Sequence, residues 1–201
     1  PNMQDLLPID DMVASGRLPH NAYLINGQSG DFITGGHIPP SMQGMETSWE
    51  IMFNELVNKH FSQWLHLKTS DNLASVEKRL QRELSAIVPD PYEYFDKAAL
   101  YEFWEWQERQ SKYVVNGQRV YDWLNLDWSL PLWEKEYLDF WQRVPYRLKY
   151  GQKLYKNYLK TKNYYGVFEH FEDYVWRWPG INLAVVPTAR VIGLLGGQKS
   201  K

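Results

Sequence analysis

The sequence contains no cysteine among its 201 residues. A disulfide framework, a thiolate metal site and a cysteine nucleophile are therefore excluded. The chain also has no apolar run that approaches the ~20 residues of a membrane-spanning helix. Residues 1–10 lack the basic start and apolar middle of a secretory signal. Together these absences predict a soluble protein and favour a cytoplasmic location.

An excess of charge of one sign is missing as well. Lysine and arginine number 22 and aspartate and glutamate 24, which gives a formal net charge of -2 at pH 7. Binding to nucleic acid needs a concentrated basic surface from which counterions are released. The composition therefore argues against a nucleic-acid partner.

Two common kinds of catalytic site also lack their sequence pattern. None of the five histidines has metal-ligand spacing, and none forms an i,i+4 pair around an acid. Ser29 lies in G-Q-S-G-D, where Asp31 stands in place of the second glycine of a nucleophile elbow. The sequence therefore predicts no metal site of this kind and argues against a serine hydrolase.

Aromatic residues are abundant, at 16% of the chain, with ten tryptophans and fourteen tyrosines. Large amphipathic rings are typical of cores and interfaces. They also form surfaces on which sugars or bases stack. Both interpretations remain open from the sequence.

The spacing of apolar residues predicts one mainly helical domain over residues 1–201, with one or two short strands near the N-terminus. A short helix should end at residues 15–19, and residues 22–26 should form a buried strand. Helices are predicted from a cap at Thr47 or Ser48, from residues 70–71 to about Val88, and over residues 94–115, 132–143 and 152–162. The apolar runs in the tail, residues 179–197, fit either strands or short helices.

The expected strand runs into a glycine-rich segment, residues 27–37, that we predict to be loop throughout. Glycines such as Gly27 and Gly30 expose backbone N–H groups that can cradle phosphate, and Ser29 lies between them. Asp31 is a candidate ligand for magnesium or a ribose hydroxyl. A tight turn is the alternative interpretation of the same residues.

Charged residues form two further patterns. Glu102, Glu105 and Glu108 recur every three residues on one predicted helix, which we interpret as a solvated, ion-paired face rather than a carboxylate metal face. Basic residues concentrate between positions 143 and 162. This region is either a solvated face or an anion site, with Lys153 the candidate because it follows Gly151 at a predicted helix start.

Three blocks of the sequence resemble the synthetase domain of the asparagine synthetase family, which has the N-type ATP pyrophosphatase fold. Residues 27–36 read G-Q-S-G-D-F-I-T-G-G, close to the family's G-E-G-x-D-E-x-x-x-G-G loop. Residues 129–134 read S-L-P-L-W-E, where the family has R-x-P-F-L-D. A proline, Pro145, then precedes G-Q-K-L-Y-K at residues 151–156, similar to the family's G-x-K-x-x-L-R.

This resemblance implies the helical C-terminal part of an α/β adenine-nucleotide alpha hydrolase-like domain that uses ATP and Mg²⁺. Lys153 and Gln28 would be catalytic, and the nucleotide would be bound by Gly27, Ser29, Gly30 and Asp31. Such enzymes adenylate a carboxylate, which ammonia then attacks. The family's S-G-G-x-D-S pyrophosphate loop lies upstream of these blocks and is absent here, so an upstream region of the same protein is the expected partner.

The aromatic run F-W-E-W-Q-E-R at residues 103–109 resembles the branch of this family in bacterial surface-polysaccharide biosynthesis, including lipopolysaccharide O-antigen and capsule. That likeness implies a small-molecule carboxylate, a sugar acid or nucleotide-sugar, as acceptor. Gln28, Phe32 and Ser129 stand where the family has two glutamates and an arginine. The alternative is therefore a noncatalytic helical scaffold or carbohydrate-binding module that retains the fold.

Overall fold

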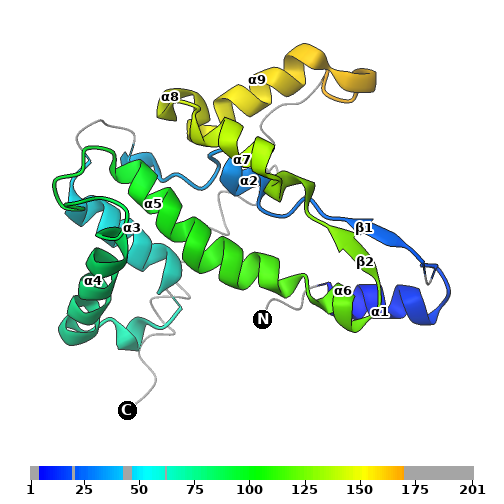
Figure 1. The fold of residues 1–201 in the computed structure, drawn as a ribbon, viewed down its shortest axis with the longest axis horizontal. Helices are drawn as coiled ribbons and strands as arrows, with labels where there is room; N and C mark the ends of the chain where they lie inside the picture. Colours follow the sequence, from blue (N-terminus) through cyan, green and yellow to red (C-terminus); the bar gives the residue numbers. More distant parts are fainter. Residues whose placement is uncertain (1–4, 20, 43–46, 62, 170–201) are drawn as a thin grey trace, which may run out of the picture. The chain divides into compact units, whose positions relative to one another are not determined.

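A computed structural model describes residues 5–19, 21–42, 47–61 and 63–169 of the chain (Figure 1). These residues are mainly helical with two short parallel strands, so this part of the predicted fold class is confirmed. The chain divides into two compact units, Pro1–Lys156 and Asn157–Lys201. The predicted tail elements, residues 179–197, lie outside the described residues.

The described elements follow one another in this order. The first half contains α1 (Leu6–Ala14), β1 (Tyr23–Ile25), α2 (Gly30–Ile33), η1 (Pro40–Met42), α3 (Trp49–His60), η2 (Leu65–Leu67) and α4 (Ser70–Leu84). The second half contains α5 (Lys97–Glu105), the π-helix η3 (Trp106–Val115), α6 (Val120–Trp123), β2 (Asp127–Ser129), η4 (Pro131–Trp133), α7 (Lys135–Gln142), α8 (Tyr146–Lys149), η5 (Tyr150–Gln152), α9 (Lys153–Lys162) and η6 (Tyr164–Gly166).

Helices α3 and α4 begin at the capping residues that their sequences supply. The Ser48 side chain accepts a hydrogen bond from the Ile51 N–H, and Thr69 accepts one from the Asn72 N–H. Each cap satisfies a backbone donor that the first helical turn leaves unpaired. The predicted cap of α3 is confirmed. Helix α4 begins at Ser70, capped by Thr69, which was not predicted as the cap, and it ends at Leu84, before the predicted limit near Val88.

The main core lies where α3 and α4 pack beside α5 (Figure 1). Its fully buried side chains come from all three helices and from η1. They include Met42, Met52, Leu56, Leu80, Leu84, Leu100 and Tyr101. The 3.6-residue period therefore identified the inward faces of α3 and α4.

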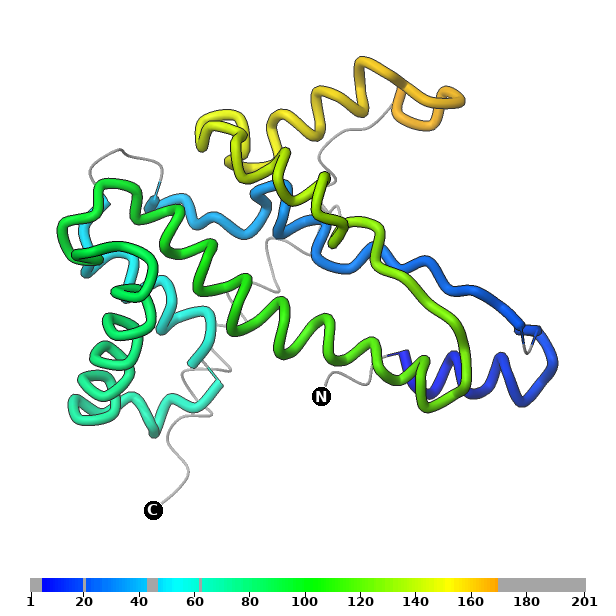
Figure 2. Tube along the Cα trace, in the orientation of Figure 1, coloured from blue at the N-terminus to red at the C-terminus, as the bar shows by residue number. Residues whose placement is uncertain are grey.

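The predicted helix over residues 94–115 forms as α5 followed directly by η3, one continuous rod in Figure 2. Its second half has π-helical hydrogen bonding, which is rare and often occurs at functional sites. Buried residues occur along both parts, from Ala98 and Trp104 to Gln110 and Val114. This distribution agrees with a helix that is covered along most of its length.

Strands β1 and β2 pair in parallel, with Leu24 opposite Trp128. The predicted strand at residues 22–26 therefore exists, but its predicted burial is wrong, because Tyr23 is 60% and Ile25 75% exposed. β2 was not predicted, since three residues without an apolar run give no strand signal. Parallel strands are usually covered on both faces, so the exposed side chains of β1 are unusual.

Residues 27–37 are not loop throughout, as predicted from their glycines. Residues 30–33 form the single helical turn α2, which buries Phe32 and Ile33 against Trp141. Ser29 precedes it with a left-handed φ of 68°. Burial of the two apolar side chains outweighs the weak helix propensity of this sequence.

Candidate functional site

Asn26, which joins β1 to the glycine-rich segment, is fixed by several hydrogen bonds. The Asn26 N–H donates to the Ser129 carbonyl at 3.0 Å, which continues the strand pairing by one residue. The Asn26 side chain donates to Gln118 Oε1 at 2.5 Å and to Tyr121 Oη at 3.1 Å. Its Oδ1 accepts from the Gln28 N–H at 3.0 Å. These contacts fix the direction in which the segment enters α2.

Beyond α2 the segment meets a buried charge cluster centred on Glu105, whose side chain is 0% exposed. His37 Nδ1 lies 2.5 Å from Glu105 Oε1, and Lys59 Nζ lies 2.9 Å from Oε2. Arg109 contributes a longer contact of 3.6 Å, and the other ring nitrogen of His37, Nε2, lies 2.8 Å from Asp31 Oδ2. We call these five side chains, Asp31, His37, Lys59, Glu105 and Arg109, the Glu105 network.

The electrostatics of this network favour a protonated His37 between two carboxylates. Burial disfavours the charged imidazole, but hydrogen bonds to Asp31 and Glu105 outweigh burial and raise the His37 pKa above 6.5. The hydrogen bond from His37 lowers the pKa of Asp31 to about 2. Burial opposes ionisation of Glu105 too, yet His37 and Lys59 together lower its pKa. The network therefore keeps both acids ionised at neutral pH.

The predicted nucleotide-binding residues do not all face open space. Ser29 is 4% exposed, and its hydroxyl donates to Gln110 Oε1 at 2.7 Å. A Cβ on Gly30 would lie 2.7 Å from Leu132 Cδ1, so this glycine permits close packing against the protein itself. A Cβ on Gly27 would meet nothing within 4 Å. The tight-turn interpretation thus accounts for Ser29 and Gly30, while Gly27 is open to a ligand.

The first and third blocks of the sequence meet in space. Gln152 Nε2 donates to Thr34 Oγ1 at 2.7 Å, across 118 positions of sequence. Gly35 lies against the Lys149 backbone, where a Cβ would come within 2.2 Å of the carbonyl oxygen. Lys153 is exposed and begins α9 immediately after Gln152. The G-Q-K turn and the glycine-rich segment therefore belong to one region of the first unit.

The sequence did not predict most of the Glu105 network. It also led to a wrong prediction that Glu102 and Glu105 are solvated. The face with Glu102, Glu105 and Glu108 is ion-paired, as predicted, but it is not solvated: Glu105 is buried, and the Glu102 carboxylate is 18% exposed beside Lys149. His37 has neither metal-ligand spacing nor an i,i+4 histidine partner, so its spacing from other residues carries no catalytic signal. Its position after Gly35 and Gly36 was the available hint.

One residue of the segment, Asp31, has a carboxylate that could hold the magnesium ion of a magnesium–nucleotide complex. The Asp31 side chain is 65% exposed. Its two oxygens each accept one hydrogen bond, from His37 and from the Phe32 N–H, which leaves further lone pairs free. Magnesium is typically held by one or two carboxylates together with substrate phosphates. Within the described ranges, no cluster of three or more His, Asp or Glu side chains could hold a metal ion.

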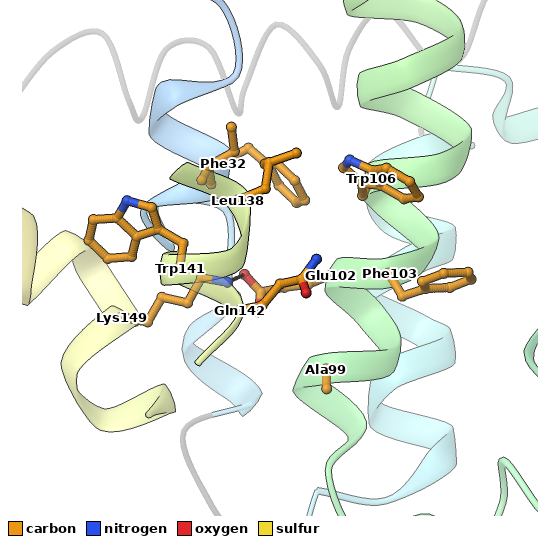
Figure 3. Close-up of a pocket in the computed structure, with 10 residues that line it drawn as sticks. Phe32, Ala99, Glu102, Phe103, Trp106, Leu138, Trp141, Gln142 and Lys149 are labelled. Atoms are coloured by element: carbon orange, nitrogen blue, oxygen red, sulfur yellow. Dashed lines mark ion pairs between the residues drawn. The ribbon is translucent and has the colours of Figure 1, made fainter. Parts of the chain in front are cut away.

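A second concave feature, the aromatic pocket, opens between α2, α5 and α7 (Figure 3). Its volume is about 360 Å³. It is lined by Phe32, Ile33, Ala99, Glu102, Phe103, Trp106, Leu138, Trp141, Gln142 and Lys149. Figure 3 shows the ion pair of Glu102 and Lys149, 2.8 Å apart, extending between α5 and the segment around Lys149.

No helix in the described part of the chain is both long and apolar enough to traverse a bilayer. Comparison of the sequence with models of known protein families found no match, and neither did comparison with curated proteins or with solved structures.

Proposed function

We propose that this chain is part of an ATP-dependent amide ligase of the asparagine synthetase type, acting in the cytoplasm. ATP would supply the adenylyl group to a carboxylate, and ammonia would displace AMP. The supporting observation is the Gln152–Thr34 hydrogen bond, which joins the two sequence blocks that the resemblance assigns to one nucleotide site.

Each predicted site residue has a place in this proposal. Lys153 would neutralise the charge that develops on the departing pyrophosphate, since preorganised cations stabilise such charge most effectively. Asp31 would hold Mg²⁺, and Gln28 would line the acceptor side. Gly27 would offer its backbone to phosphate, while Ser29 and Gly30 would set the course of that backbone by packing.

The proposal includes a partner region that would hold the S-G-G-x-D-S loop. Tyr23 and Ile25 of β1 are exposed on a two-stranded parallel sheet, an arrangement that other strands or helices usually cover. We assign that cover to the upstream region, which would bring the pyrophosphate loop beside Asp31. The acceptor would be a small carboxylate such as a sugar acid or nucleotide-sugar of O-antigen or capsule synthesis.

The decisive experiment uses Lys153→Ala in the full-length protein, with release of AMP from ATP as the measurement. Loss of one preorganised charge-stabilising group typically lowers kcat by about 10²–10³-fold, so we expect a decrease of that size. Lys162→Ala, in the last turn of the same helix, is the matched control and should retain full activity. An unchanged rate in Lys153→Ala would remove Lys153 from the mechanism.

A noncatalytic scaffold is the second candidate. The observation in its favour is that Ser29 and Gly30 make contacts inside the protein rather than with a ligand. The full-length protein would then release no AMP with any carboxylate. Lys153→Ala would leave binding of its partners unchanged.

A further inference from the structure

The aromatic pocket is large enough for a single sugar ring. Ligand pockets typically enclose about 300–1,000 Å³, and this one measures about 360 Å³. All its lining residues lie within the first compact unit. The size therefore suits one small ring inside the pocket.

Four aromatic residues line the pocket, and Trp106 is the most exposed of them. Trp106 is 38% exposed, and Trp133 stacks against it at an interplanar angle of 24°. Phe103 packs beside Trp106 with the ring centroids 6.2 Å apart. Phe32 and Trp141 also belong to the lining, but each is only 4% exposed. Trp106 therefore presents the apolar face that suits the C–H face of another ring.

The polar part of the wall is the ion pair of Glu102 and Lys149. Glu102 Oε1 lies 2.8 Å from Lys149 Nζ, and the two side chains are 18% and 12% exposed. Burial raises the pKa of Glu102 despite the adjacent Lys149. A carboxylate can accept more than one hydrogen bond. A ligand hydroxyl could therefore donate to Glu102 beside Lys149.

The charge balance of the pair limits the class of ligand. The ammonium of Lys149 and the carboxylate of Glu102 neutralise each other, so the pocket offers no excess charge to an anion or a cation. Lys149 has spare donors and Glu102 has spare acceptors. These features match a neutral ring with hydroxyl groups around its edge and C–H groups on its faces.

We infer that the aromatic pocket binds a neutral pyranose, with its ring face on Trp106 and its hydroxyl groups on Glu102 and Lys149. This binding does not depend on the proposed ligase activity, because it requires neither ATP nor the Lys153 region. Within the ligase it would fix the sugar portion of an acceptor. The carboxylate of that acceptor would lie outside the pocket.

The test is ligand-observed NMR of the full chain with the methyl glycosides of glucose, galactose and N-acetylglucosamine, with adenosine as a comparison. We expect at least one glycoside to bind with a dissociation constant of about 1 mM, a weak affinity appropriate to a single ring. Trp106→Ala and Glu102→Gln should each weaken it about tenfold or more, as removal of a central contact usually does. Trp123→Ala, which removes a 70% exposed tryptophan outside the pocket, is the control.

Three results would overturn the inference. One is that no glycoside binds. Another is that glycosides bind equally to the protein and to Trp106→Ala, with both folded by circular dichroism. The third is that adenosine alone binds and depends on Trp106, which would assign the pocket to a base. Failure of AMP release in the ligase experiment, by contrast, would leave glycoside binding unaffected.

Discussion

Glu105 shows how a charged side chain is retained where the solvent does not reach it. His37 and Lys59 contact its two oxygens, and Arg109 lies 3.6 Å from one of them. Removing one member of a buried ion pair strongly lowers the stability of the protein, because the charge of the remaining partner is then uncompensated. At this position the carboxylate stabilises the first unit and also the loop that presents Asp31.

We expect Glu105→Gln to destabilise the protein by about 3–5 kcal/mol, since His37, Lys59 and Arg109 would lose the buried anion that they share. Urea unfolding measures the change in the free energy of unfolding. Glu108→Gln is the matched control one turn along, because Glu108 pairs with the more exposed Lys112 and should cost under about 1 kcal/mol. Equal effects in the two variants would show that the Glu105 network contributes no special stability.

The raised pKa of His37 predicts how the stability of the protein changes with pH. Its pKa is raised above 6.5 in the folded protein, so its contribution is fully present below pH 6.5 and is lost as the pH rises through the folded pKa. The free energy of unfolding should therefore decrease on the alkaline side of pH 6.5. Compared with the unchanged protein, His37→Gln should have a smaller decrease over the same range. Parallel pH profiles for the two proteins would contradict the assignment.

Helix α2 is followed by a closely packed turn. Thr34 accepts the Gln152 hydrogen bond directly after the helix, and Gly35 then crosses the Lys149 carbonyl with a φ of +94°. Only glycine adopts this conformation at low cost and leaves room for the carbonyl. The element thus connects the glycine-rich segment to the chain just before Lys153.

Gly35→Ala should destabilise the protein by about 2 kcal/mol or more, because it combines a forbidden contact with an unfavourable φ. Gly27→Ala is the control, since its added Cβ would meet nothing within 4 Å and should change stability by less than about 1 kcal/mol. Thermal unfolding followed by circular dichroism measures both. A Gly35→Ala protein as stable as the control would rule out this packing.

At the scale of the whole molecule, large apolar side chains remain exposed on several elements. Besides Tyr23 and Ile25 of β1, the group includes Trp64, Leu65, Phe95 and Trp123. Under the proposed function, these side chains are candidates for the surface on which an upstream region of the same protein would dock.

The sequence by itself determined the helices whose signals are local. The cap at Ser48 and the 3.6-residue spacing of apolar residues suffice, because they act within one or two turns. It also located the glycine-rich segment and Lys153 at the start of α9. Local rules identify positions of this kind without any knowledge of what lies beside them.

Only the tertiary structure decided burial, pairing and the pockets. The sequence predicts that Glu105 is solvated and that β1 is buried. In the structure Glu105 is buried, and Tyr23 and Ile25 of β1 are exposed. β2 exists because residues about a hundred positions away pair with it, and Glu102 faces the aromatic pocket because Lys149 lies opposite. Burial and charge compensation depend on neighbours that are distant in sequence, so no local pattern of residues specifies them.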